Sequence, residues 1–253
     1  LWAELGGTWL GSVREGTASP GARLVYVHES EPLSEIVRDD PAELRARFSG
    51  NAKPIVLNAV IGPRGDAYRP EAAISMDSAE QYFAQQLGWL AATEIDMVSA
   101  LTFNQAGEAA GLAKAASKVG LPAVISFTVE TNGALPNGQS LADAIAEVDA
   151  ATGQYPAYYM VNCAHPDHFG DALLDAPWAR RIRGIRANAS RRSHAELDAA
   201  PELDAGNPQE LAQQYRALAN RMPWLNVFGA CCGSDLRHVT EIARALEGRN
   251  GPV

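Results

Sequence analysis

Short apolar runs and longer helix-like segments alternate along most of this chain, from residue 51 toward the C-terminus. The runs are rich in β-branched residues and cover 54–63, 95–103, 122–130, 156–164, 182–190 and 225–233. The segments between and after them cover 78–93, 106–120, 140–152, 168–181, 207–222 and 235–248, with apolar residues at helical spacing. Apolar strands that alternate with helices are typical of a parallel sheet buried on both faces, so the pattern predicts an α/β fold.

Two architectures contain such a sheet, the doubly wound sheet and the (β/α)8 TIM barrel. No G-x-G-x-x-G motif follows any of the runs, which disfavours a dinucleotide-binding doubly wound sheet. Polar residues and cysteines gather near the carboxyl ends of the predicted strands, namely Asn58, Thr102, Thr128, Asn162, Cys163, Asn188, Cys231 and Cys232. Because a barrel carries its active site at this end of its strands, we expect a (β/α)8 TIM barrel.

The N-terminal quarter is too short for two regular barrel units. Residues 21–30 read as a strand and 32–48 as its helix, whereas 1–10 offer a candidate first strand followed by a loop over 11–20. A parallel crossover needs at least about 10–12 residues including its helix, and that loop leaves little room for one. We therefore expect a single barrel domain over 1–253 in which 1–53 are divergent or truncated first units.

Composition excludes several classes of function. The formal net charge of −9 and the pI of about 5.1 differ from the basic surface of a nucleic-acid binder, so no nucleic-acid partner is expected. No run approaches 18 apolar residues and the start lacks a secretory pattern, so we expect no membrane partner and a cytoplasmic location. The three cysteines are an odd number that suggests no disulfide framework, and the oligomeric state stays open.

The cysteines form the most informative constellation. Cys163 ends the fourth of the six runs, while Cys231 and Cys232 end the last one, so all three would open onto the same barrel mouth. Three thiolates are the ligand set of a zinc site that keeps its fourth position open. Free cysteines often only fill a core, but the placement of all three at predicted strand ends favours a metal site.

Two segments around these cysteines resemble a known family. The stretches "MVNCAHP" (160–166) and "FGACCGSDLRHV" (228–239) are similar to the two zinc-ligand signatures of the homocysteine S-methyltransferase family. Further similarity lies in "VIGPRGDAY" (60–68), in "VISFTVETNGALPNGQSLADAI" (124–145) and in "IRGIRANAS" (182–190). The resemblance extends from about residue 54 to 247.

This resemblance implies a zinc-dependent S-methyltransferase on a (β/α)8 barrel, with zinc held by Cys163, Cys231 and Cys232. The thiol of homocysteine takes the open position and receives a methyl group from an onium donor, which gives methionine. The donor is S-methylmethionine, S-adenosylmethionine or a betaine, and the partners are these small molecules. Candidate substrate-binding residues at the barrel mouth are Asn162, Thr102, Thr128, Glu130 and Asn188.

Thiol chemistry agrees with this reading. A free thiol has a pKa near 8.5 and is a weak nucleophile at neutral pH, whereas a thiol on zinc is deprotonated. The onium donor leaves as a neutral compound, so methyl transfer requires no general acid. A zinc hydrolase is less favoured, because a three-thiolate centre is a weak Lewis acid for water and no general base is evident nearby.

Departures from the family pattern keep other functions open. The family carries a glutamate for the amino group of homocysteine at the end of its fourth strand, and Leu101 stands there in this chain. Thr102, Asn104 or Glu130 would have to replace it. The alternatives are therefore a zinc-binding barrel relative that acts on another thiol, and a catalytically inactive structural relative. His165 and His238 are more typical of supporting or packing residues than of metal ligands.

Overall fold

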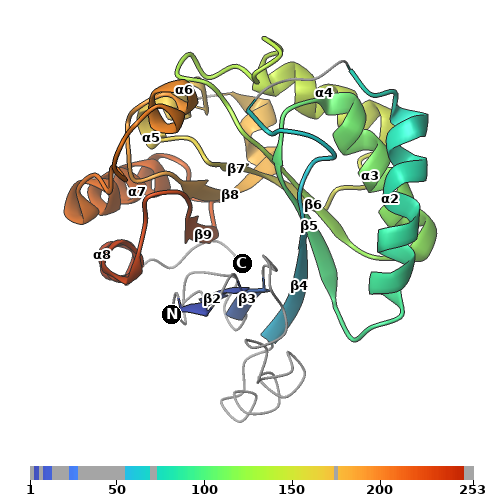
Figure 1. Cartoon of the computed structure of the whole chain (residues 1–253), viewed down its shortest axis with the longest axis horizontal. Helices are drawn as coiled ribbons and strands as arrows, with labels where there is room; N and C mark the ends of the chain where they lie inside the picture. Colours follow the sequence, from blue (N-terminus) through green and yellow to red (C-terminus); the bar gives the residue numbers. More distant parts are fainter. Residues whose placement is uncertain are drawn as a thin grey trace.

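The computed structural model describes the side chains of residues 56–68, 73–173 and 176–247, and the backbone of 55 and of three N-terminal strands. A nine-stranded sheet runs through the molecule in chain order from β1 to β9 (Figure 1). The N-terminal strands are β1 (Ala3–Leu5), β2 (Thr8–Ser12) and β3 (Arg23–Val27). β2 is antiparallel to both of its neighbours, and every later pairing is parallel.

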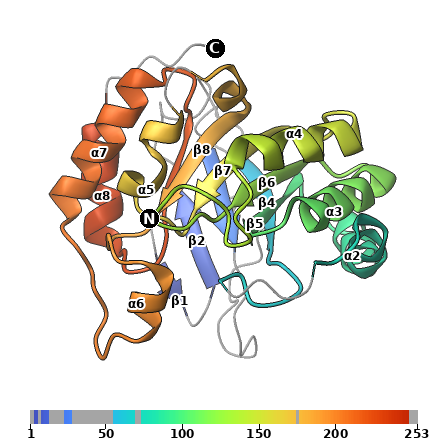
Figure 2. The ribbon, with the colours of Figure 1, turned by 90° about the horizontal axis from the view of Figure 1, so that it is seen from above.

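All six predicted apolar runs form strands. They are β4 (Ile55–Ile61), β5 (Met97–Phe103), β6 (Ala123–Phe127), β7 (Tyr158–Asn162), β8 (Ile182–Ala187) and β9 (Val227–Ala230). These six parallel strands curl into a half-barrel with helices along its outer side (Figures 1 and 2). The α/β class and a partial barrel are therefore confirmed.

The eight-unit barrel is not formed by the described strands. β1 and β2 pair antiparallel, and only two residues separate them, a connection that suits a hairpin and excludes a parallel crossover. Among the described strands β9 pairs with β8 alone, so no closing pair is seen. The strand predicted over 21–30 is confirmed as β3, while the helix predicted over 32–48 lies outside the described residues.

Five of the predicted helices are confirmed. They are α2 (Met76–Ala91), α3 (Ala106–Val119), α4 (Leu141–Thr152), α7 (Pro208–Arg221) and α8 (Leu236–Ala245). Local signals fix their ends: the hydroxyl of Ser140 accepts a hydrogen bond from the Asp143 backbone, and Gly120 ends α3 in the left-handed conformation.

The continuous helix predicted over 168–181 is wrong. Three short pieces occupy the region, α5 (Pro166–Phe169), η2 (Asp171–Leu173) and η3 (Pro177–Arg181). Pro177 lacks the backbone N–H that a continuing helix needs, and it begins a new 3-10 turn instead. A further short helix, α6 (His194–Asp198), follows β8 and begins with a capping box of Ser193 and Glu196.

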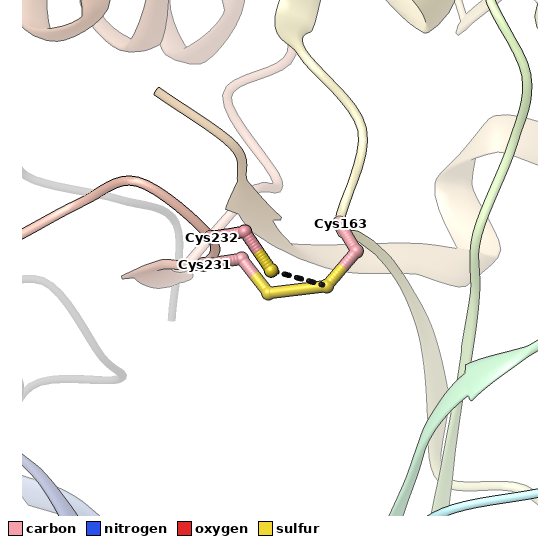
Figure 3. Close-up of side chains that lie close together, drawn as sticks. All are labelled: Cys163, Cys231 and Cys232. Atoms are coloured by element: carbon pink, nitrogen blue, oxygen red, sulfur yellow. Dashed lines mark hydrogen bonds between the residues drawn. A yellow bond between two sulfur atoms is a disulfide. The ribbon is translucent and has the colours of Figure 1, made fainter. Parts of the chain in front are cut away.

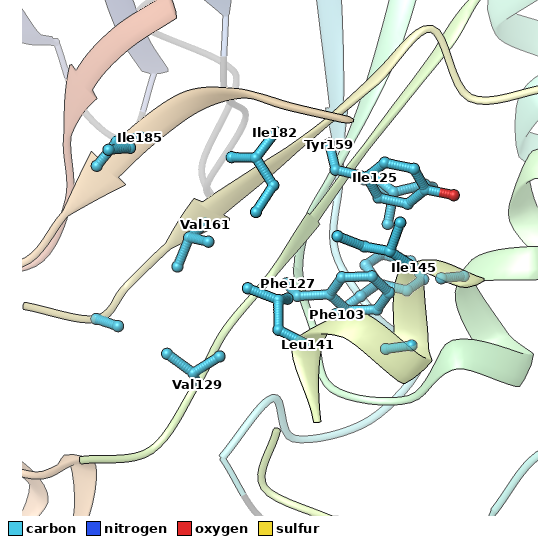
Figure 4. Packing of buried hydrophobic residues seen from close by; sticks show 14 of the residues in the cluster. Phe103, Ile125, Phe127, Val129, Leu141, Ile145, Tyr159, Val161, Ile182 and Ile185 are labelled. Atoms are coloured by element: carbon cyan, nitrogen blue, oxygen red, sulfur yellow. The ribbon is translucent and has the colours of Figure 1, made fainter. Parts of the chain in front are cut away.

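The large core lies between the strands and the helices. Figure 4 shows Ile125 and Phe127 of β6, Tyr159 of β7 and Ile145 of α4 packed in this layer, and all four are buried. Side chains alternate along each strand, so the intervening residues face the inside of the curl. There Met97, Val124, Met160 and Val227 form a second, smaller cluster.

Polar residues follow this inner cluster toward the carboxyl ends of the strands. Asn58 lies in the middle of β4 instead of at its end, which corrects the sequence-based placement, and its amide oxygen accepts a hydrogen bond of 3.0 Å from the buried Ser99 hydroxyl. Beyond this pair the inner face opens into a cavity. Of the helices described, none combines the length and apolar character needed to cross a membrane.

Candidate metal centre and cavity

Three cysteine side chains converge where β7 and β9 end (Figure 3). Their sulfur atoms all lie within 4.8 Å of one another, and the sulfurs of Cys163 and Cys232 are 3.9 Å apart. Cys163 and Cys231 are joined as a disulfide with a Cα–Cα distance of 5.5 Å. The fold thus brings together residues 68 positions apart in the sequence.

The cluster suits a zinc ion once the disulfide is reduced. Sulfurs at about 2.3 Å from a tetrahedral zinc are about 3.8 Å apart, close to the distance between Cys163 and Cys232. Zinc binds thiolates, so a zinc ion at this cluster would require the disulfide to be reduced first. The sequence analysis expected no disulfide framework, whereas Cys163 and Cys231 are joined by a disulfide. Sulfur atoms that converge on one point are close enough to bond to each other.

Asn188 connects the two cysteine-bearing loops. Its side-chain amide donates to the carbonyl oxygen of Cys163 at 3.0 Å, and its amide oxygen accepts from the backbone N–H of Cys232 at 3.1 Å. The side chain is buried, so both bonds are shielded from water. Asn188 therefore fixes the spacing of the two loops that carry the cysteines.

The turn after the paired cysteines requires a glycine. Gly233 has a φ of 78°, and a Cβ atom there would lie 2.7 Å from the carbonyl oxygen of Asp204. A side chain at this position would therefore be strained and would collide with backbone. The turn leads directly into α8, which Asp235 caps.

His194 holds the first cysteine from the other side. Its Nε2 lies 2.6 Å from the carbonyl oxygen of Cys163, and because a carbonyl only accepts, Nε2 carries the proton. Nδ1 of the same ring lies 3.4 Å from the carboxylate of Glu130. Cys163 has a φ of 53°, a left-handed conformation that is uncommon outside glycine, and this contact helps to maintain it.

A cavity of about 330 Å³ borders the sulfur cluster. Its described lining comprises Val60, Gly62, Pro63, Gly65, Ala67, Tyr68, Leu101, Thr102, Asn162, Cys163, Arg186, Cys231 and Cys232. Of the five candidate substrate-binding residues, Thr102 and Asn162 line the cavity. Thr128, Glu130 and Asn188 lie outside this lining, and the Thr128 hydroxyl is buried with no hydrogen-bond partner among the described residues.

Tyr68 contacts the cysteine cluster and was missed by the sequence analysis. Its hydroxyl is hydrogen-bonded to Cys232, and its ring lies 4.2 Å from the His194 ring. Burial raises the pKa of Tyr68 well above its ordinary value, so the hydroxyl keeps its proton and acts as the donor. The stretch 60–68 carried a family resemblance, which is the signal that pointed to this region.

Cys232 forms part of the concave wall of the cavity. Its side chain is exposed toward the cavity, but the residues around it keep most of the bulk water away from the sulfur. This desolvation raises the pKa of the Cys232 thiol. The hydrogen bond with Tyr68 and the charge of Arg186 act in the opposite direction and lower that pKa. Both neighbours therefore favour the thiolate that a metal ligand requires.

Arg186 is the second residue that the sequence analysis missed. It lies on β8 among apolar residues, and its side chain is 8% exposed. An arginine at an inward-facing strand position is unusual in a core, and that alone was the signal available in the sequence.

The two histidines near the cysteine motifs have structural roles. His165 is buried at the start of α5, where its Nδ1 accepts from the Asp167 backbone at 3.3 Å, and burial lowers its pKa to about 4. His238 is buried in α8, where its Nε2 donates to the carbonyl oxygen of Ala205 at 2.7 Å. This agrees with the prediction that both are supporting or packing residues.

Comparisons with known proteins agree with the geometry. The family model described as "Homocysteine S-methyltransferase" matches residues 26–246. No curated protein matches the chain by sequence. Among solved structures, three forms of the homocysteine methyltransferase MmuM from Escherichia coli are similar in fold.

The apo form has a TM-score of 0.55 at 19% identity, and the alignment covers 83% of this chain and 68% of that one. The metallated form has 0.57 at 18% identity with 83% and 67% covered, and the oxidized form has 0.59 with the same identity and coverage. The chain thus spans about two thirds of the length of these neighbours. The motifs around the cysteines and the match over 26–246 establish that this methyltransferase chain belongs to the homocysteine S-methyltransferase family.

Proposed function

We propose that this chain is a zinc-dependent S-methyltransferase that moves a methyl group from an onium donor to the thiol of homocysteine, giving methionine. The observation that carries the proposal is the convergence of three cysteine sulfurs within 4.8 Å at the edge of a 330 Å³ cavity. The family model and the metallated form of the MmuM neighbour support a metal at these sulfurs.

The residues present fit the metal. The donor set consists of sulfur only, which favours zinc over magnesium or calcium. Zinc held by the three thiolates would supply a fourth position in which an acceptor thiol loses its proton at neutral pH. Tyr68 donates to one of the three thiolates, and Asn188 fixes the backbone of two.

Methyl transfer depends mainly on the correct alignment of the two substrates, and no proton has to move during the step itself. A bond forms between the acceptor sulfur and the methyl carbon while the bond from that carbon to the onium centre breaks. Both electrons of the broken bond stay with the donor, which leaves neutral, so no general acid is needed. The role of the cavity is to align the acceptor sulfur, the methyl carbon and the leaving atom, and to exclude water from them.

Zinc content and homocysteine binding together test the proposal. The reduced protein should contain one zinc per chain, and homocysteine should add a fourth sulfur to the metal, seen by X-ray absorption. Cys232→Ala should lose the zinc, whereas Ser234→Ala, two residues along the same loop and outside the described cavity lining, should keep it. A reduced protein without zinc would reject the proposal. Parallel assays with S-methylmethionine, S-adenosylmethionine and betaine then identify the donor.

A further inference from the structure

The loop 62–68 brings Tyr68 to the cysteine cluster. It follows β4, and its seven residues, all of them described, form neither helix nor strand. It contributes five residues to the cavity lining, namely Gly62, Pro63, Gly65, Ala67 and Tyr68. The Tyr68 hydroxyl is hydrogen-bonded to Cys232, and its ring lies against His194. Because irregular loops hold a side chain less precisely than strands or helices do, this contact depends on what fixes the loop backbone.

Asn104 fixes the end of this loop. It directly follows β5, and its side-chain Nδ2 donates to the carbonyl oxygens of Asp66 at 3.2 Å and of Ala67 at 2.8 Å. These are the two residues before Tyr68, so the amide holds the backbone from which the tyrosine side chain starts. Asn104 is 2% exposed, so water competes little for either hydrogen bond.

A second hydrogen bond fixes the beginning of the loop. Glu108 lies in the first turn of α3, is buried, and accepts from the backbone N–H of Arg64 at 2.7 Å. The start of α3 belongs to the large core through Ala106 and Ala109. The loop is therefore joined to the core at both of its ends, and Asn104 is the anchor nearer to Tyr68.

We propose that Asn104 is a positioning residue for the zinc ligand Cys232, and that it acts through the loop 62–68 and the Tyr68 hydroxyl. The assignment rests on the function proposed above, since it concerns the zinc that Cys232 would bind. Asn104 was one of the residues considered in the sequence analysis as a replacement for the family's glutamate. Its amide group donates to the loop instead. A displaced loop would take the Tyr68 hydroxyl away from Cys232, and the ligand would lose a supporting hydrogen bond.

Hydrogen exchange tests the hold on the loop without any metal. A serine hydroxyl carries one proton and cannot donate to both carbonyls, so Asn104→Ser should loosen the loop. In the reduced, metal-free protein, amides in 62–68 should exchange about fivefold faster or more than in the wild type, as measured by mass spectrometry. Peptides from α4, away from the loop, should exchange at the wild-type rate. An unchanged rate in 62–68 would overturn the assignment.

Zinc affinity tests the consequence for the ligand. Competition with a chromophoric chelator should show that Asn104→Ser weakens zinc binding by up to about tenfold, in the same direction as Tyr68→Phe. In the Tyr68→Phe background, Asn104→Ser should change the affinity by less than about twofold, because the hydrogen bond that it supports is already gone. Equal weakening in both backgrounds would mean that Asn104 does not act through the tyrosine hydroxyl, and would overturn the proposal.

Two further variants separate positioning from a general loss of stability. Tyr159→Phe removes a hydrogen bond of 2.8 Å to Asp149 on the outer side of the sheet, so it should lower stability but leave loop exchange and zinc affinity unchanged. Asn104→Thr, closer to asparagine in volume and also with a single hydroxyl, replaces Asn104→Ser if the serine variant unfolds. The same weakening of zinc binding in Tyr159→Phe as in the Asn104 variant would contradict the assignment.

Failure of the proposed function would look different from failure of this assignment. A reduced wild type without zinc would reject the function and, with it, any role of Asn104 in zinc binding. If zinc binds to the wild type and the Asn104 variant matches it in loop exchange and in zinc affinity, the function stands and the assignment is wrong.

Discussion

The side-chain amide of Asn162 makes two hydrogen bonds to Thr102. Its Nδ2 donates to the threonine hydroxyl at 2.8 Å, and its Oδ1 accepts from the threonine backbone N–H at 2.9 Å. Thr102 has a φ of 63°, a conformation that costs a β-branched residue about 1–3 kcal/mol. The amide thus holds a strained residue at the cavity wall, and it also accepts from the buried Ser126 hydroxyl at 2.5 Å.

Replacement of Asn162 by alanine should therefore lower stability markedly. Asn162→Ala removes all three of these bonds and leaves buried groups without partners, so the free energy of unfolding should fall by about 2–4 kcal/mol. Denaturant unfolding of the reduced protein measures this. Asn137→Ala, at an exposed turn residue that accepts from the Gln139 backbone, should change it by less than about 1 kcal/mol.

A double-mutant cycle tests the strain directly. Because glycine tolerates a positive φ, Thr102→Gly should be less costly in the Asn162→Ala background than in the wild type. Additive effects of the two substitutions would mean that the amide does not maintain the strained conformation.

The hydroxyl of Tyr68 should strengthen metal binding. Tyr68→Phe keeps the ring against His194 but removes the hydrogen bond to Cys232, so that thiolate loses a donor. Loss of such a supporting bond typically weakens metal affinity by about 10–100-fold, and we expect the lower end of this range. Competition with a chromophoric chelator at constant pH measures the change.

Tyr155→Phe is the control for this variant. The Tyr155 hydroxyl donates to the carbonyl oxygen of Leu121 at 2.8 Å, away from the cavity lining, so its loss should affect stability but leave zinc affinity unchanged. Equal zinc affinities of Tyr68→Phe and the wild type would show that the hydroxyl does not support the ligand.

A partly buried ion pair on the outer side of the sheet should contribute to stability. Arg181 makes two hydrogen bonds to the Asp149 carboxylate, at 2.9 and 2.8 Å, and the Tyr159 hydroxyl donates to the same carboxylate at 2.8 Å. Asp149→Ala would leave the guanidinium and the hydroxyl without this partner. We expect a loss of about 2–3 kcal/mol in denaturant unfolding, reduced from the fully buried case by the partial exposure of Arg181.

The exposed pair of Glu241 and Arg244 provides the comparison. Glu241→Ala removes an ion pair within one turn of α8, and such surface pairs contribute about 0.5 kcal/mol or less. A loss in Asp149→Ala no larger than in Glu241→Ala would mean that burial adds nothing to the Asp149 pair.

The sequence predicted the six parallel strands and five helices because their signals are local. Apolar runs and residues such as Ser140 and Gly120 act within a few positions of the elements they define. The prediction of one helix over 168–181 was wrong because it relied on the helical spacing of apolar residues and did not take into account that Pro177 interrupts a helix. The (β/α)8 barrel, with divergent or truncated first units, was expected from the residues at the strand ends and from the family resemblance. The two-residue link between β1 and β2 permits only an antiparallel pair.

At the site, the cysteines could be found from the sequence and their neighbours could not. Cys163 directly follows β7, and Cys231 and Cys232 directly follow β9, and parallel strands bring their carboxyl ends to one edge. Tyr68 and Arg186 lie close enough to Cys232 to affect its thiol. Their positions depend on how the sheet curls and on the turn after β4, which the sequence does not reveal. Asn188 was expected to touch substrate, whereas its two bonds to cysteine backbones depend on how the loops after β7 and β9 meet.

Acid should weaken the start of α8 through Asp235. The Arg237 guanidinium, bonded to this carboxylate at 2.9 Å, holds the pKa of Asp235 well below its usual range, and His238 acts in the same direction. Because the folded pKa is depressed, the unfolded chain binds the proton first, so this contribution is complete above about pH 4 and is lost as pH falls below that value. Asp235→Asn keeps a capping side chain without this titration, so its stability should fall less steeply below pH 4 in denaturant unfolding. Asp171→Asn, at a carboxylate that is 99% exposed, should follow the wild-type curve, and parallel curves for Asp235→Asn and the wild type would contradict the assignment.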